Sequence, residues 1–250
     1  MTQERALSIL KTGANVFLTG EPGAGKTHTL NAYIEYLKNH NIDVAVTAST
    51  GIAATHINGM TIHAWSGIGI KDYLTPQDLD QITQRERVVK RITKAKVLVI
   101  DEISMLDGGV LSMVEQVTRI VKGTPMPFGG MQVVLVGDFF QLPPIAKRGE
   151  VAQFGFQSSV WQGVSPLVCY ISEQHRQEDV TLLSLLSGLR SGVIDDSYYE
   201  LLESCKETSF TEGIEPTKLY THNADVDRIN TERLQNLRGS TTTFTMESRG

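Results

Sequence analysis

The sequence contains few cysteines: Cys169 and Cys205 are the only two among 250 residues. Two thiols are too few for a disulfide framework, so we expect an intracellular protein, in the cytoplasm or nucleoid of a bacterium or the nucleus or mitochondrion of a eukaryote. No apolar run approaches the roughly 20 residues of a membrane span, and residues 1–5 lack the apolar core of a signal peptide. We therefore expect no membrane association.

The sequence also lacks excess positive charge. Its formal net charge is −5 at pH 7, which excludes nucleic-acid binding driven by bulk charge but not binding in a local groove. Hydrophobic residues make up 40% and charged residues 20% of the chain, as in a globular protein with a substantial core.

Apolar runs alternate with helix-like stretches in the front half of the chain, without internal repeats or heptads. This alternation predicts an α/β fold with a parallel sheet flanked by helices. The expected strands are Val16–Thr19, Asp43–Ala48, Lys96–Ile100, Met131–Val136 and, last, Leu167–Ile171. Later stretches predict helices over Leu182–Leu189 and Ala224–Leu237 and a strand over Lys218–Thr221.

Residues 20–27 match the pattern G-x-x-x-x-G-K-[ST] without exception. They follow an apolar run and precede a helix-like segment, which is the context that a phosphate-binding loop requires. Backbone N–H groups of such a loop surround phosphate oxygens, the lysine reaches the β- and γ-phosphates, and the hydroxyl binds Mg²⁺. The pattern predicts ATP and Mg²⁺ as ligands, bound by Gly20, Glu21, Pro22, Gly23, Ala24, Gly25, Lys26, Thr27 and the following His28.

Polar side chains follow two further expected strands. Asp101 and Glu102 end an apolar run; the first suits the acid that holds Mg²⁺, and the second suits a general base that orients an attacking water. Gln141 follows the strand that ends near Val136, and its amide suits a sensor of the γ-phosphate. Because the carboxyl ends of parallel strands share one edge of a sheet, we expect all three to lie near the phosphate loop.

Two segments, Thr47–Ala54 and Thr61–Trp65, carry hydroxyls, an imidazole and an indole on expected loops. Such sets bind phosphates and stack bases of single-stranded nucleic acid; equally, the hydroxyls would cap helices and Trp65 would belong to the core. Residues Arg87, Lys90, Arg91 and Lys94 fall on one helical face, a pattern more typical of a solvated face than of a binding site.

With these motifs, the sequence resembles the Pif-type (petite integration frequency) DNA helicases of superfamily one, B branch. The resemblance extends over essentially the whole chain. It rests on the phosphate loop and on residues 47–54, 101–119, 128–144, 174–177 and 219–230. The stretches 102–119 and 128–144 are the most distinctive.

The resemblance implies a RecA-like first motor domain over residues 1–175, with a small wedge subdomain near residues 67–94, and the incomplete start of a second RecA-like domain over residues 176–250. It implies an ATP-dependent 5′-to-3′ helicase, here without its last motifs, that acts as a monomer on single-stranded and on forked or structured DNA. By position, Lys26, Glu102, Gln141 and Arg176 would be catalytic, Gln3 would contact adenine, and Thr27 and Asp101 would hold Mg²⁺. Thr50, His63 and Trp65 would lie near the single strand.

Two other functions stay open on the sequence alone. One is a phosphate-loop ATPase of another class, against which the two distinctive stretches argue. The other is a module that binds nucleotide without turnover, against which the presence of Lys26, Asp101 and Glu102 argues.

Overall fold

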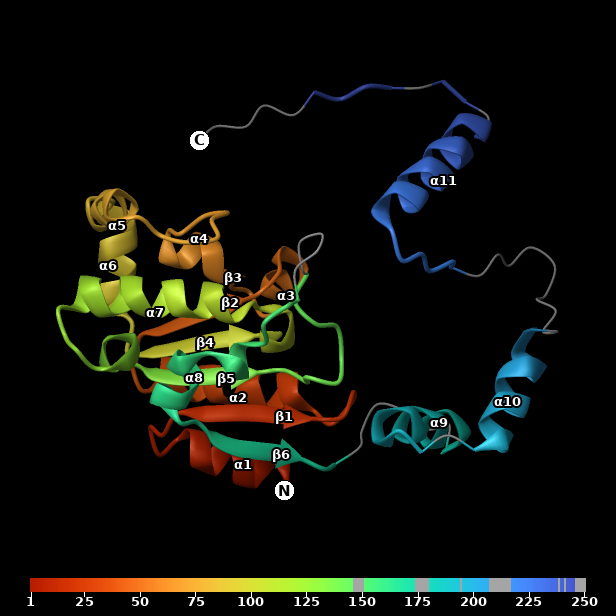
Figure 1. Cartoon of the computed structure of the whole chain (residues 1–250), viewed down its shortest axis with the longest axis horizontal. Coiled ribbons are helices and arrows are strands. Elements are labelled where there is room, and N and C mark those ends of the chain that lie inside the picture. The colour runs from red at the N-terminus through yellow and green to blue at the C-terminus, as the bar shows by residue number, and fades with distance from the viewer. Residues whose placement is uncertain are drawn as a thin grey trace. The chain divides into compact units, whose positions relative to one another are not determined.

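Six strands form one sheet in which every pairing is parallel, as the alternation of apolar and helical stretches predicts. The structure, a computed structural model, describes residues 1–145, 151–173, 180–193, 195–206, 217–237, 239–240 and 242–245. The strand order is β3-β2-β4-β5-β1-β6 (Figure 1). The strands are β1 (Val16–Gly20), β2 (Val44–Ala48), β3 (Met60–Thr61), β4 (Val97–Asp101), β5 (Gln132–Val136) and β6 (Leu167–Ile171).

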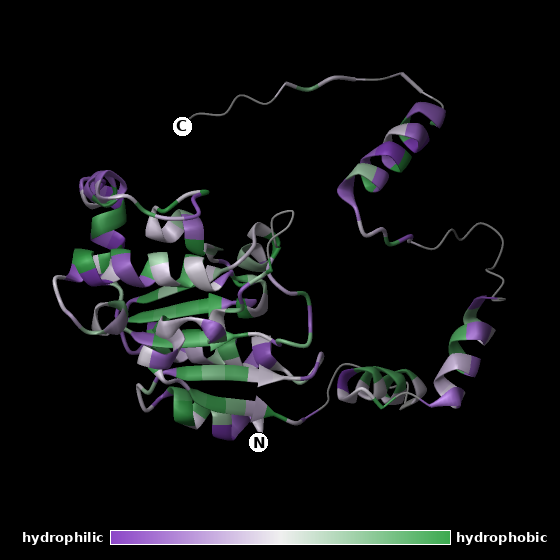
Figure 2. Ribbon diagram, viewed as in Figure 1, coloured by the Kyte–Doolittle hydropathy of each residue, from purple (hydrophilic) through white to green (hydrophobic). Residues whose placement is uncertain are grey.

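The sheet is apolar on both faces, which is why its strands read as nearly unbroken hydrophobic runs (Figure 2). Side chains along a strand alternate between faces. In β4, Leu98 and Ile100 belong to one buried cluster, and Val97 and Val99 belong to the other. One apolar cluster therefore lies on each face of the sheet, between the sheet and a layer of helices.

The helices divide between these clusters. Those that pack on the cluster of Val97 are α1 (Gln3–Leu10), α2 (Lys26–Asn39) and α3 (Gly51–His56). Those that pack on the cluster of Leu98 are α4 (Ile62–Ser66), α5 (Pro76–Thr83), α6 (Glu86–Lys94), α7 (Gly108–Lys122) and α8 (Ser159–Val164). Three short 3₁₀ helices are η1 (Ile103–Met105), η2 (Pro127–Gly130) and η3 (Gly155–Gln157). The helix that follows β6 along the chain is α9 (Val180–Ser191).

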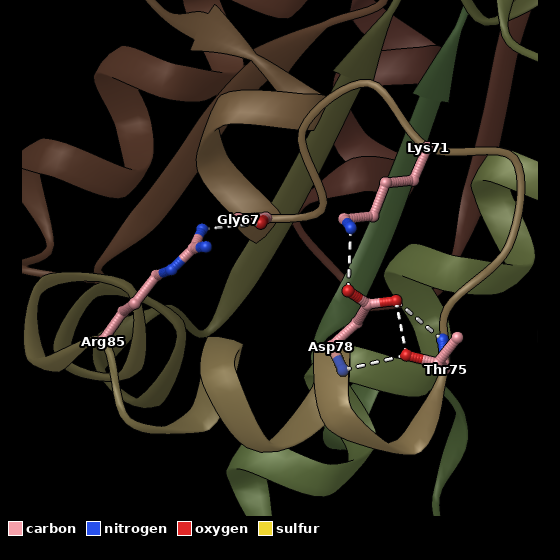
Figure 3. A network of polar contacts seen from close by, with 5 residues as sticks. All are labelled: Gly67, Lys71, Thr75, Asp78 and Arg85. Carbon is pink, nitrogen blue, oxygen red and sulfur yellow. Dashed lines mark hydrogen bonds and ion pairs between the residues drawn. The ribbon is translucent and has the colours of Figure 1, made fainter.

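The segment between α4 and α6, part of the predicted wedge subdomain, is closed by polar contacts (Figure 3). Thr75 and Asp78 form a capping box at the start of α5, with Pro76 at the first helical position. Lys71 binds the Asp78 carboxylate at 2.7 Å, and Arg85 donates to the Gly67 carbonyl at 3.2 Å. Hydrogen bonds from Lys71 and Thr75 hold the pKa of Asp78 well below its ordinary range.

The chain divides into two compact units, Met1–Val193 and Ile194–Gly250. The described part of the second unit holds α10 (Asp196–Lys206) and α11 (Asn223–Asn236), neither with a buried residue. The helix expected near 224–237 is confirmed, whereas the strand expected over Lys218–Thr221 is wrong: these residues form no strand. A strand needs a hydrogen-bonded neighbour, and the described residues of this unit supply none. Among all described residues, no helix is long and apolar enough to cross a membrane.

Candidate functional site

Four strands end at the same edge of the sheet with polar or glycine-rich loops. The phosphate loop follows β1, Ser49 and Thr50 follow β2, Asp101 ends β4 with Glu102 directly after it, and the loop that begins at Gly137 follows β5. In the strand order, β5 lies between β1 and β4. The loop after β5 therefore starts between the phosphate loop and the acidic pair, at the edge where open α/β sheets bind ligands.

The phosphate loop leads directly into a long helix. Helix α2 begins at Lys26, and its N-cap is Gly25, which provides no side-chain cap. The first N–H groups of α2 are thus left for an anion. Two glycines of the loop are required for different reasons. A Cβ on Gly20 would lie 2.4 Å from the Ile171 carbonyl oxygen, which is backbone, whereas Gly25 has φ +88°, a conformation that other residues rarely adopt. A Cβ on Gly25 would also lie 2.2 Å from Gln3 Nε2, so the Gln3 side chain would have to move.

Lys26 lies folded over its own loop. Its ammonium group donates to the carbonyl oxygens of Gly20 at 2.8 Å and Glu21 at 3.1 Å. Burial lowers the pKa of Lys26, Arg190 lowers it further, and the carboxylates of Asp138, Glu102 and Asp101 oppose both. Three carboxylates and one guanidinium are therefore close enough to act electrostatically on this lysine.

Gln3 joins α1 to the phosphate loop. Its side-chain amide donates to the Ala24 carbonyl at 3.2 Å, and its backbone N–H donates to Glu173 Oε2 at 2.9 Å. The side chain assigned to adenine recognition by resemblance therefore contacts the loop itself. Its role toward adenine stays a prediction.

Asp101 is a buried acid at the end of β4, with 8% of its surface exposed. Burial raises its pKa to about 6, against a hydrogen bond from the Glu102 N–H at 2.9 Å. The carboxylate is thus mostly ionised at neutral pH, as a Mg²⁺ ligand must be. An ionised carboxylate at Asp101 and the hydroxyl of the exposed residue Thr27 are the hard oxygen donors that Mg²⁺ prefers, and they fit the predicted metal site.

Glu102 has an unusual backbone conformation. At φ +52° and ψ +45° it lies in the left-handed region, at the start of η1. For a residue other than glycine this conformation stores on the order of 1 kcal/mol or more, and such strain clusters at functional sites. Two hydroxyls near Glu102 are buried and find no hydrogen-bond partner among the described residues: Ser104 Oγ, two residues further along the chain, and Ser49 Oγ, whose backbone N–H donates to the Asp101 carbonyl at 3.1 Å. The region thus carries both strain and unused polar atoms.

Gln141 is held by Asp138, a residue that the sequence did not indicate. The side-chain amide of Gln141 donates to Asp138 Oδ2 at 3.2 Å. The same oxygen accepts from Arg190 of α9, a second residue that the sequence did not indicate. Asp138 lies within the stretch 128–144, so its position was a signal, but nothing in the sequence pairs it with a residue 52 positions away.

The residues assigned to nucleic acid lie in different environments. Thr50 and Thr61 cap helices α3 and α4 through their hydroxyls, and Trp65 is a core residue with 3% of its surface exposed. The indole therefore offers no exposed ring face in this conformation. His63 is half-buried, which lowers its pKa, and it lines a groove of about 640 Å³ together with Thr61, Ile70, Lys71 and Ile145.

The predicted basic face on α6 is partly structural. Arg91 donates to the Ala64 carbonyl of α4, and Lys94 pairs with Asp43 at 2.9 Å, whereas Arg87 and Lys90 are exposed. Arg176, assigned to catalysis by resemblance, lies outside the described residues.

Comparisons with known proteins agree with this geometry. The family profile described as PIF1-like helicase matches residues 3–185. The chain belongs to the PIF1-like helicase family. A relative from Psychrobacter, named ATP-dependent DNA helicase Pif1, is 46% identical over all of this chain and 39% of its own length.

Solved structures of the PIF1-like family share the fold. The Pif1 helicase from Candida albicans is 34% identical, with a TM-score of 0.87 over 95% of this chain and 54% of that one. A Bacteroides Pif1 helicase in complex with ADP-AlF3 and single-stranded DNA is 29% identical, with a TM-score of 0.81 over 95% of this chain and 57% of that one. The chain thus spans well under two thirds of the length of these family members.

Proposed function

We propose that this chain carries the ATP site and first motor domain of an ATP-dependent DNA helicase that moves 5′ to 3′ and unwinds duplexes. The single observation that supports it most is the convergence of Lys26, the Asp101–Glu102 pair and the loop of Gln141 at one edge of the sheet, in a chain of the PIF1-like family. Residues 1–175 would form the first motor domain, and residues 176–250 would begin the second.

The residues divide the work of hydrolysis. The N–H groups at the start of α2 and the Lys26 ammonium bind the triphosphate, which requires Lys26 to exchange its contacts to the Gly20 and Glu21 carbonyls for phosphate oxygens. Glu102 orients the attacking water and accepts its proton. Thr27 and Asp101 would hold Mg²⁺, which when bound neutralises charge on the phosphate oxygens. Gln141 responds to the γ-phosphate, and Gln3 contacts adenine.

The DNA-binding part of the proposal uses the groove that His63 lines. Ile70 and Ile145 expose apolar surface in it beside the His63 imidazole, a combination that suits stacked bases. Its charged lining is mixed: Lys71 is paired with Asp78, and Asp72 and Asp107 line the same groove, so we assign it to base contacts and not to the phosphate backbone. Thr50 would contact the strand from the end of β2. The Bacteroides relative in complex with single-stranded DNA supports single-stranded DNA as the ligand, and the protein would act on single-stranded and forked DNA as a monomer.

Two motor domains are needed for translocation, because each must grip the strand in turn. This chain has one arginine assigned to catalysis, Arg176, and the resemblance implies a further arginine at the γ-phosphate in the family's last motifs. An arginine finger contributes about 10³–10⁵-fold to phosphoryl transfer. We therefore expect the 250-residue chain to bind ATP but hydrolyse it slowly.

The test compares this chain with one extended through the remaining family motifs. ATP hydrolysis is measured with and without single-stranded DNA, and unwinding is measured on forks with a 5′ tail or, as the matched control, a 3′ tail. We expect DNA-stimulated hydrolysis and 5′-tail unwinding from the longer chain alone. Robust unwinding by residues 1–250 would refute the two-motor account, and absence of DNA stimulation in the longer chain would refute the helicase assignment.

A further inference from the structure

A buried ion pair lies at the edge of the nucleotide site and joins α9 to the loop after β5. Arg190 Nη1 donates to Asp138 Oδ2 at 2.5 Å, with 15% of the arginine side chain and none of the aspartate side chain exposed. The guanidinium carbon also lies 4.4 Å from the centre of the Phe140 ring. Two contacts, one ionic and one to an aromatic face, thus fix this arginine.

The Asp138 carboxylate organises the loop that carries Gln141. Its Oδ1 accepts the Phe140 N–H at 3.1 Å, and its Oδ2 accepts both the Gln141 side-chain amide at 3.2 Å and Arg190. An ionised carboxylate only accepts hydrogen bonds, so Gln141 must present its NH₂ group to it. The carbonyl oxygen of that amide is thereby turned away from Asp138. The orientation of the Gln141 amide, with its NH₂ group toward Asp138, therefore depends on an ionised Asp138.

Arg190 is the charge that keeps Asp138 ionised. Burial alone would raise the pKa of Asp138, but hydrogen bonds from Arg190, the Phe140 N–H and Gln141 hold it below its ordinary value. Removing one partner of a buried pair leaves the other charge uncompensated. Without Arg190, Asp138 would take up a proton or turn toward water, and either change would release the Gln141 amide.

The pair also lies against the phosphate loop. Arg190, Asp138 and Gln141 line one cavity of about 260 Å³ together with Glu21 and Pro22. Both charges act electrostatically on Lys26, in opposite directions. A substitution of Arg190 would therefore change the electrostatic potential at Lys26, where the phosphates would bind, without any direct contact between Arg190 and the phosphate loop.

We propose that Arg190 is a positioning residue of the ATP site, which acts through Asp138 to fix the orientation of the Gln141 amide. The proposal rests on the proposed function, in which Gln141 responds to the γ-phosphate. It makes α9, the helix after the segment that carries Arg176, part of the hydrolytic machinery.

The test is a double-mutant cycle in the full-length protein, read as kcat and KM for ATP in DNA-stimulated hydrolysis. Arg190→Met should lower kcat by about tenfold or more and change KM by less than about threefold, as expected for an interaction that acts in the transition state. In a Gln141→Ala background the same substitution should cost less than about twofold, because residues that act as one unit are not additive. Arg190→Lys, which keeps the charge, should recover part of kcat.

Three further variants and measurements keep the test decisive. Lys206→Met breaks an exposed ion pair with Glu203 on α10 and should leave both constants unchanged. Thermal unfolding identifies a variant that does not fold; Asp138→Asn, which keeps the shape of the side chain, then replaces Arg190→Met in the cycle. Multiplicative effects of the Arg190 and Gln141 substitutions would overturn the proposal, as would a raised KM with normal kcat. Wild-type protein without DNA-stimulated hydrolysis would instead refute the proposed function.

Discussion

Asp101→Asn should stabilise the magnesium-free protein while it removes the predicted Mg²⁺ ligand. Asp101 is 8% exposed, and burial raises its pKa from an ordinary value of 3.8 to about 6. Between these two values the folded state binds more protons than the unfolded state, so stability falls as pH rises. The loss of stability that comes from ionising the buried Asp101 is absent below pH 3.8 and fully present above the folded-state pKa. A neutral asparagine at this position avoids that loss.

The magnitude follows from the size of the shift. A change of about two pKa units, at about 1.4 kcal/mol each, costs the ionised protein about 3 kcal/mol at pH 7. At pH 5 the folded-state carboxyl is mostly protonated, and the cost falls to about half. Asparagine keeps an oxygen that can accept the Glu102 N–H, which Asp101 binds at 2.9 Å. The free energy of unfolding should therefore rise by about 2–3 kcal/mol at pH 7 and by about half as much at pH 5.

Urea unfolding of the 250-residue chain in EDTA at both pH values measures this difference. The matched control is Asp43→Asn, which removes an exposed carboxylate paired with Lys94 and should change the free energy of unfolding by about 0.5 kcal/mol or less. An Asp101→Asn protein that is no more stable than wild type at pH 7 would refute the argument. A gain that does not shrink at pH 5 would do the same, since it would then have another cause.

Three further substitutions test the site. Lys26→Ala should weaken ATP binding at least about tenfold, or about 1.4 kcal/mol, by loss of a charge-assisted contact; unchanged affinity in calorimetry would contradict the phosphate-loop assignment. Glu102→Gln in the longer chain should keep ATP binding but slow hydrolysis by roughly 10²–10⁴-fold, and turnover within a factor of about three would exclude Glu102 as the base. Gly25→Ala should displace Gln3, with which its Cβ would clash, and weaken ATP binding measured in the same way; Gly13→Ala, at φ +83° in open space, is the control for backbone strain alone and should leave ATP affinity unchanged.

The sheet was readable from the sequence because strands buried on both faces are continuous apolar runs. The runs ending at Thr19, Ala48 and Ile100 each match a strand within one residue at that end. Strand β3 has only two residues and no such run, so composition does not reveal it. Lys218–Thr221 shows the opposite error: β-forming residues make no strand where the described chain offers no neighbour to pair with.

The candidate site was only partly readable. Asp101 ends a strand and Lys26 and Gln141 lie in segments that follow strands; the strand order brings all three to one edge, which is expected of any parallel sheet. Trp65 illustrates the limit, because an indole in a loop-like segment is compatible with a binding face and with the core until packing decides. Arg190 illustrates a second limit. The helix expected from the sequence, Leu182–Leu189, ends one residue before Arg190, whereas α9 continues to Ser191.

The importance of Asp138 follows from topology rather than from any motif taken alone. A strand order with β5 between β1 and β4 starts the loop after β5 between the phosphate loop and the acidic pair. An acidic residue at its start can act on Lys26 from one side and receive Arg190 from α9 on the other. The buried charge is tolerated because Arg190 and two N–H groups satisfy it. The same carboxylate therefore links the orientation of Gln141 to the position of α9, the last helix of the first unit.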